Sequence, residues 1–110
     1  MESGYLKIAQ KTEITVGKMK KFVPEGKEIL IANINGNYYA IEARCPHKAG
    51  ELLQGTLEGN IITCPNHGAK FDATTGKVIS PPKMGFFHPK IKDAISYQVK
   101  IENGYILVKL

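Results

Sequence analysis

A chain of 110 residues with 43% apolar content is long enough for one compact domain with a modest core. No stretch approaches the roughly 20 continuous apolar residues of a membrane span, and the start, MESGYLKIAQ, lacks the long apolar segment of an export signal, so we expect a cytoplasmic protein without a membrane span. The formal net charge of +5 favours an acidic protein partner over nucleic acid, because acidic residues interleave with the lysines and no basic-aromatic RNA-binding motif occurs.

Short apolar or alternating segments recur along the chain and predict β-strands. In chain order they are residues 5–9, 29–34, 38–42, 61–64, 97–101 and 105–109. The turns Asn35-Gly36-Asn37, Glu58-Gly59-Asn60 and Glu102-Asn103-Gly104 contain residues that accept the positive φ of tight hairpins, so each predicts one hairpin.

No long window keeps an apolar stripe at helical spacing, although residues 18–22 could form a single helical turn. We therefore expect an all-β, mostly antiparallel fold in a single domain that spans residues 1–110. Residues 80–95 contain several prolines and a glycine, and they predict an irregular loop rather than a domain boundary.

Both cysteines and two of the three histidines fall in two short blocks, CPHKAG at residues 45–50 and CPNHG at residues 64–68. Two cysteines and two histidines can hold a tetrahedral zinc ion, or they can be a disulfide with two unrelated histidines. A classical zinc finger takes its cysteines from one element and its histidines from another. Here each block supplies one of each, which favours a two-iron cluster in which each iron takes a matched pair.

The pattern Cys45-X-His47 followed by Cys64-X-X-His67 resembles the signature of Rieske proteins, in which two histidines replace two cysteines on one iron of a [2Fe-2S] cluster. The order Lys-Phe-Asp, Thr-Gly and Pro-Pro after the second block is also similar to that of Rieske ferredoxins. The resemblance implies an antiparallel β-sandwich-like base with a small two-loop cluster-binding subdomain at about residues 43–82. It also implies that both cysteines bind the inner iron and both histidines bind the outer iron, near solvent.

Departures from the family pattern are informative too. High-potential members carry a disulfide between the cluster loops, but the matching positions here are Gly50 and Asn66. Those members also place hydroxyl groups near the cluster sulfurs, at positions that correspond to Ala69 and Phe71. Hydrogen bonds to sulfur favour the reduced state, so we expect a potential near the low end of the Rieske range of about −150 to +300 mV.

Other residues near the two blocks have structural or electrostatic interpretations. Asp72 and Thr75-Gly76 predict a turn in which side-chain oxygens bind backbone amides. His88 has no cysteine beside it, so we interpret it as a loop residue and not as a ligand. Lys48, Lys70 and Lys83 could steer an acidic partner.

The loop at residues 83–93 is longer than in compact ferredoxins and could hold partner specificity. Its Phe86-Phe87 pair is more consistent with capping the core than with docking.

The function that these observations favour is one-electron transfer by a Rieske ferredoxin, with one [2Fe-2S] cluster per chain. The resemblance implies redox partners, namely a reductase and a terminal oxygenase or another acceptor. A chain of this size leaves little room for a substrate pocket, so we expect no catalytic residues. Two alternatives stay open: a cluster-bearing small subunit of a larger oxidoreductase, and a zinc-bound interaction module.

Overall fold

A computed structural model describes residues 4–44, 51–65, 68–80 and 92–110 of the chain. Across these residues the elements are ten β-strands and three short 3-10 turns. None of the helical turns in this part of the chain is long and apolar enough to cross a membrane. The prediction of an all-β fold is therefore confirmed.

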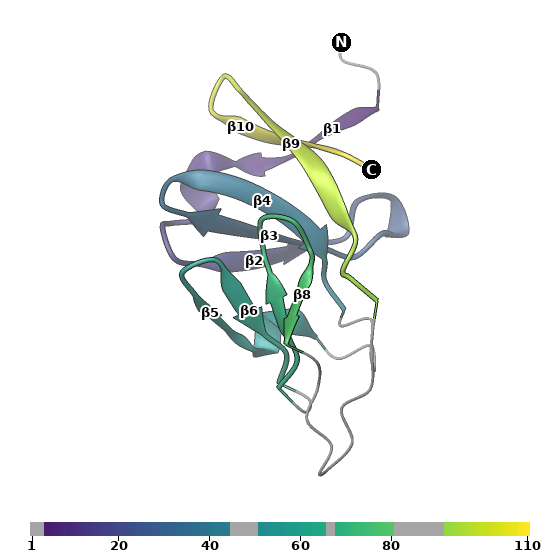
Figure 1. Cartoon of the computed structure of the whole chain (residues 1–110). Coiled ribbons are helices and arrows are strands. Elements are labelled where there is room, and N and C mark those ends of the chain that lie inside the picture. The colour runs from purple at the N-terminus through teal and green to yellow at the C-terminus, as the bar shows by residue number, and fades with distance from the viewer. Residues whose placement is uncertain (1–3, 45–50, 66–67, 81–91) are drawn as a thin grey trace, which may run out of the picture.

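The strands form two antiparallel sheets (Figure 1). The six-stranded sheet has the order β1-β10-β9-β4-β3-β2. Its strands are β1 (Tyr5–Gln10), β2 (Met19–Phe22), β3 (Ile29–Ile34), β4 (Asn37–Glu42), β9 (Ser96–Glu102) and β10 (Tyr105–Lys109). The four-stranded sheet consists of β5 (Thr56–Glu58), β6 (Ile61–Thr63), β7 (Lys70–Asp72) and β8 (Val78–Ser80) in sequence order. The 3-10 turns are η1 (Lys11–Glu13), η2 (Pro24–Gly26) and η3 (Leu52–Gln54).

All six strands predicted from the sequence form, and their ends agree within one residue. The three predicted hairpins form as well. Asn35 and Gly36 have φ values of 55° and 89°, Asn103 and Gly104 have 52° and 80°, and Gly59 has 61°. These are the left-handed conformations that two-residue hairpin loops need, and asparagine and glycine adopt them at low cost.

The helical turn expected at residues 18–22 is wrong, because Met19–Phe22 forms strand β2. A segment of this length gains too few helical hydrogen bonds to offset the cost of nucleation. As a strand it pairs with β3 from Met19↔Ala32 to Phe22↔Ile29. The short strands β5 and β7 were also not predicted, because three residues are too few to show a period.

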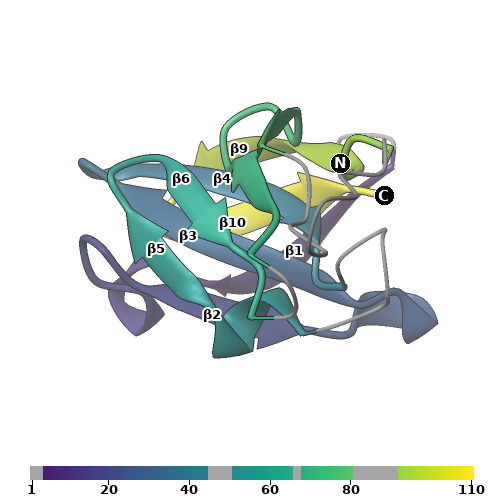
Figure 2. The ribbon, with the colours of Figure 1, turned by 60° about the horizontal axis from the view of Figure 1, so that its bottom comes forward.

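Strand β3 is buried along its whole length, since both of its faces are covered. Leu30, Ala32 and Ile34 belong to the core cluster that also includes Ile62 and Phe71 of the four-stranded sheet. Ile29 and Ile31, on the other face, belong to a second cluster with residues of β1 and β10. Figure 2 shows the four-stranded sheet lying over β3 and β4. This double burial explains why β3 begins with four consecutive apolar residues, Ile29 to Ala32, instead of alternating apolar and polar residues.

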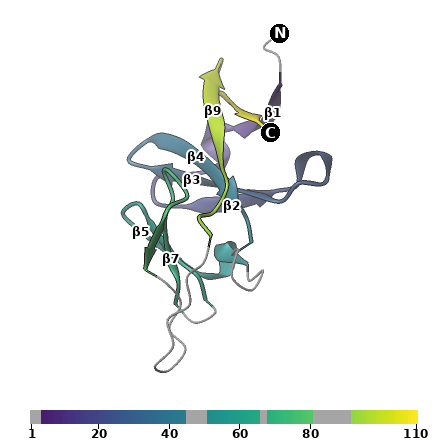
Figure 3. The same ribbon diagram turned by 45° about the vertical axis from the view of Figure 1, so that its right-hand side comes forward.

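The second core cluster requires a strongly curved six-stranded sheet. Ile106 and Val108 of β10 pack in the same cluster as Ile29 and Ile31 of β3, although β9 and β4 lie between these strands in the sheet order. The registered pairs of β4 with β9 are Ala40↔Tyr97 and Ile41↔Ser96. Beyond them β9 diverges from β4, so that β1, β9 and β10 form a separate upper part of the molecule (Figure 3).

Candidate metal centre

Of the four cluster ligands expected from the sequence, Cys64 lies in the described part of the chain. Cys45, His47 and His67 lie outside the described residues, as do Gly50, Asn66, Lys48, Lys83, the Phe86-Phe87 pair and His88. The residues that flank both ligand blocks are described, and they define how each block is held. In the described part of the chain no group of three or more His, Cys, Asp or Glu side chains could bind a metal by itself.

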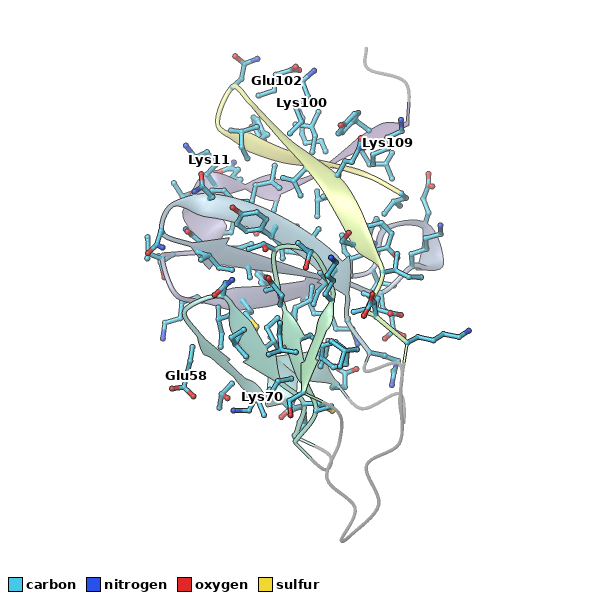
Figure 4. All side chains as sticks on the ribbon, in the orientation of Figure 1. Lys11, Glu58, Lys70, Lys100, Glu102 and Lys109 are labelled. Carbon is cyan, nitrogen blue, oxygen red and sulfur yellow. The ribbon has the colours of Figure 1, made fainter. Side chains whose placement is uncertain are left out.

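Strand pairing brings the ends of the four-stranded sheet to one edge. Thr63 at the end of β6 pairs with Lys70 at the start of β7, and Lys70 pairs with Ser80 at the end of β8. The second ligand block therefore connects two adjacent strand ends. Figure 4 places Lys70 at this end of the molecule and places Lys11, Lys100 and Lys109 at the opposite end.

Cys64 follows β6 directly, and its side chain is buried, with 2% of the residue exposed. Its backbone N–H donates to the carbonyl oxygen of Ala69 at 2.7 Å. Between these residues Gly68 has a φ of +72°, a conformation that favours glycine. We call Cys64 and Ala69 the second stem, because their hydrogen bond holds the two ends of the second ligand block together.

The second stem is surrounded by apolar side chains. Cys64, Ala69 and Phe71 belong to one buried cluster, and both Ala69 and Phe71 have no exposed surface. Neither Ala69 nor Phe71 carries a side-chain hydrogen-bond donor. A buried cysteine next to a glycine turn and among apolar residues fits the inner, thiolate side of a cluster site.

Backbone contacts also join the two ends of the first ligand block. Arg44 and Glu51, the residues on either side of it, form an isolated antiparallel β-bridge. The next residue pair is linked as well, because the N–H of Leu52 donates to the carbonyl oxygen of Ala43 at 2.9 Å. We call these four residues the first stem.

The first stem carries a charged network. The Arg44 guanidinium contacts both oxygens of Glu28, with Nε–Oε2 at 2.6 Å and Nη2–Oε1 at 3.1 Å. Lys21 Nζ lies 2.6 Å from Oε1 of Glu28 and 2.6 Å from Oε1 of Glu51. Hydrogen bonds from Arg44 and then from Lys21 lower the pKa of Glu28 from 4.5 to about 2.

Hydrogen bonds also hold residues 92–95, the segment that precedes β9. The N–H of Val78 donates to Oδ1 of Asp93 at 2.9 Å, and the N–H of Ile95 donates to Oε1 of Glu42 at 2.9 Å. The N–H of Ala94 donates to the carbonyl oxygen of Gly76 at 2.7 Å. Residues 92–95 therefore lie between the end of β4, which precedes the first ligand block, and the β7–β8 turn.

The turn predicted around Asp72 is confirmed. Oδ1 of Asp72 accepts hydrogen bonds from the N–H and the hydroxyl of Thr74, at 2.8 and 2.6 Å, and Lys77 N–H donates to the Thr75 hydroxyl at 3.2 Å. Burial raises the pKa of Asp72, but hydrogen bonds from Thr74 and Asn60 and the charge of Lys77 together lower it by more, so the pKa lies below its ordinary value. The turn orders the hairpin between β7 and β8, behind the second stem.

Sequence reasoning missed Lys21, Glu28, Arg44 and Glu51 as a group. The available signal was that Arg44 and Glu51 border the first ligand block with opposite charges. Nothing in the spacing connected this pair with Lys21 or Glu28, because their proximity depends on the pairing of β2 with β3.

Comparison with protein families extends these observations. The model of the Rieske [2Fe-2S] domain matches residues 4–92. The chain is 34% identical to the ferredoxin component of the naphthalene 1,2-dioxygenase/salicylate 5-hydroxylase systems of a Ralstonia species, over all of this chain and 99% of the relative. It is 39% identical to sulredoxin of Sulfurisphaera tokodaii, over 76% of this chain and 78% of the relative.

A solved structure shows a similar fold. The ferredoxin of carbazole 1,9a-dioxygenase from Nocardioides aromaticivorans superposes with a TM-score of 0.80 at 26% identity, covering 96% of this chain and 97% of that chain. Taken with the two sheets described above, this likeness confirms the fold class expected from the sequence.

Proposed function

The chain belongs to the Rieske [2Fe-2S] domain family, and on that premise we propose that it is a ferredoxin that passes electrons from a reductase to a terminal oxygenase or another acceptor. The observation that carries the proposal is the buried Cys64 at the end of β6, in a fold that matches the family along most of the chain. The full-length similarity to a ferredoxin component of an oxygenase system supports the choice of partners.

The chain is a one-electron carrier with one [2Fe-2S] cluster, and relatives that it matches over most of their length are named as ferredoxin components of oxygenase systems. This confirms the cofactor expected from the sequence, and it excludes the zinc-bound module. The bound cluster supplies the one-electron chemistry, while the protein supplies its position and its surroundings.

We infer that Cys45, His47, Cys64 and His67 hold the cluster, with the cysteines on the inner iron and the histidines on the outer iron. The burial of Cys64 supports this orientation, since it puts one thiolate on the protein side of the site. The apolar surroundings of Ala69 and Phe71 exclude water from that side. The exposed Lys70, at the same end of the molecule, provides positive charge for an acidic partner.

We also propose that residues 1–110 form a single domain. A cluster-binding subdomain at about residues 43–82 would contain both stems and the four-stranded sheet. A cytoplasmic location is also proposed, supported by relatives that are ferredoxin components of oxygenase systems.

Spectroscopy and metal analysis test the ligand assignment. The purified protein should be red-brown, should contain two iron and two labile sulfide per chain, and should give a Rieske-type EPR signal on reduction. The variants Cys64→Ser and His67→Ala should lose the cluster, whereas His88→Ala, a matched control outside the ligand set, should retain it. Retention of the wild-type signal by either ligand variant would overturn the assignment.

Reconstitution tests the partners. The reduced protein should deliver one electron per chain to a terminal oxygenase and should be reduced again by a ferredoxin reductase. An obligate small subunit of a larger oxidoreductase would instead co-purify with that enzyme and would exchange electrons poorly in isolation. That outcome would replace the ferredoxin proposal with the subunit alternative.

A further inference from the structure

The charged network at the first stem connects three separate parts of the chain. Lys21 comes from β2, Glu28 precedes β3, and Arg44 and Glu51 border the first ligand block. Each end of that block contacts a group outside it, because Arg44 contacts Glu28 and Glu51 contacts Lys21. Arg44 Nη2 also lies 3.5 Å from Oε1 of Glu51. Every member of the network therefore has at least two charged neighbours.

This arrangement constrains position more than a single ion pair does. The contact between Arg44 and Glu28 uses two donors and two acceptors, which fixes the orientation as well as the distance of the two groups. Lys21 then places its ammonium between Glu28 and Glu51. The network thus attaches both ends of the first ligand block to the edge of the six-stranded sheet.

The protein holds a comparable ion pair that has no such connection. Lys20, the neighbour of Lys21 in β2, contacts Glu13 at 3.1 Å. Glu13 lies in η1 and has no contact with either stem among the described interactions. Exposed pairs of this kind contribute little to stability. Substitution of Glu13 therefore measures the general effect of removing a surface charge, whereas substitution of Glu28 or Glu51 measures the effect of the network.

The side chains of the network are partly shielded from water. Lys21 is 21% exposed, Glu51 29%, Glu28 32% and Arg44 45%, whereas the Lys20–Glu13 pair is 50% and 39% exposed. Partial shielding strengthens the attraction between charges, but salt can still screen it. The position of the first stem should therefore depend on ionic strength.

We propose that Lys21, Glu28, Arg44 and Glu51 are positioning residues for the cluster, which hold both ends of the first ligand block in the geometry that the bound cluster requires. This inference rests on the proposed function, because Cys45 and His47 are ligands in that function. Loss of the network removes no ligand residue, but Arg44 and Glu51 are then no longer held in that geometry. The cluster then has a less uniform environment and is released more easily.

The test compares the holoproteins of the wild type, Glu28→Gln, Glu51→Gln and the control Glu13→Gln. Both network variants keep the size of the side chain and remove one charge. We expect a broader EPR signal and an altered visible circular dichroism spectrum for the reduced network variants, and a several-fold faster loss of cluster absorbance in the presence of a chelator. High salt should accelerate this loss in the wild type and have less effect in Glu28→Gln. The control should match the wild type in every measurement.

The variant Arg44→Lys provides a second measurement, because it keeps the charge but removes the two-point contact with Glu28. It should fall between the wild type and Glu28→Gln. If the network variants have the EPR signal and the cluster release rate of the wild type, the inference is wrong, even if their thermal unfolding temperatures fall. If the wild-type protein itself holds no iron and no sulfide, the proposed function fails instead.

Discussion

Both stems are closed by backbone hydrogen bonds and pack in one buried apolar cluster, but the first stem also carries a charged network. At the first stem, the buried Leu52 adjoins Arg44 and Glu51, whose network is partly exposed to water. At the second stem, Cys64 and Ala69 are both buried. Charged contacts are weakened by salt and acid, whereas apolar packing is weakened by loss of volume. Salt and acid should therefore act mainly on the first side of the metal centre, whereas loss of packing should affect both sides.

The largest effect is expected from loss of packing at the second stem. Phe71→Ala removes a ring with no exposed surface, and this should lower the free energy of unfolding by about 3–5 kcal/mol. Urea denaturation followed by circular dichroism measures the change. Phe22→Ala, at a half-buried ring on β2, should cost clearly less. If Phe71→Ala does not fold, Phe71→Leu should still fold at a smaller cost, and equal stability of Phe71→Leu and wild type would contradict the packing argument.

A smaller effect is expected beside the second stem, at the start of β5. A Cβ on Gly55, just after η3, would lie 1.9 Å from the carbonyl oxygen of Thr63, the residue before Cys64. Gly55→Ala must therefore displace backbone at the second stem, at a cost of about 1–3 kcal/mol. The control Gly104→Ala has a positive φ but no atom within 4 Å of the new Cβ, so it measures backbone strain without a clash. Only Gly55→Ala should also accelerate cluster loss, and equal release rates would show that the backbone at Thr63 does not support the second ligand block.

The next prediction concerns the potential, which the apolar second stem should keep low. Ala69→Ser introduces a hydroxyl beside Cys64, and a hydrogen bond that favours the reduced cluster by about 1.4 kcal/mol would raise the midpoint by roughly 59 mV. An EPR-monitored redox titration measures it. The control Ala73→Ser changes another buried alanine, beyond the far end of β7, and should leave the midpoint unchanged. A wild-type midpoint above about +200 mV would show that the missing hydroxyls do not set the potential, since that is near the top of the Rieske range.

The smallest expected effect is a pH dependence that belongs to the first stem. Because the pKa of Glu28 is about 2 in the folded protein and 4.5 as its ordinary value, the unfolded chain binds more protons between these values. The stabilising contribution of Glu28 is thus complete above pH 4.5 and disappears as the pH falls towards 2. Urea denaturation of Glu28→Gln should show a weaker loss of stability across this window than the wild type. Parallel pH profiles for the two proteins would contradict the role of Glu28, and Phe71→Leu should retain the wild-type slope.

Several parts of the structure follow from local sequence alone. The Asn35-Gly36 and Asn103-Gly104 turns and the alternating strands beside them were predictable, because backbone conformation and side-chain period are local properties. The spacing of Cys64 and His67, together with Cys45 and His47, was sufficient to indicate the cofactor. Ala69 and Phe71, which the sequence indicated as positions without a hydroxyl donor, are both fully buried.

Other parts depend on contacts between distant residues. Residues 18–22 became a strand because β3 offered hydrogen-bond partners, and no local period could indicate that. The same pairing brings Lys21 near Glu28, and the bridge between Arg44 and Glu51 brings Glu51 into the network. The sequence by itself thus determined the cofactor and the hairpins, since both are encoded in short patterns. Only the tertiary structure decided that a charged network joins the first ligand block to β2, because Lys21 and Glu28 lie far from Arg44 and Glu51 along the chain.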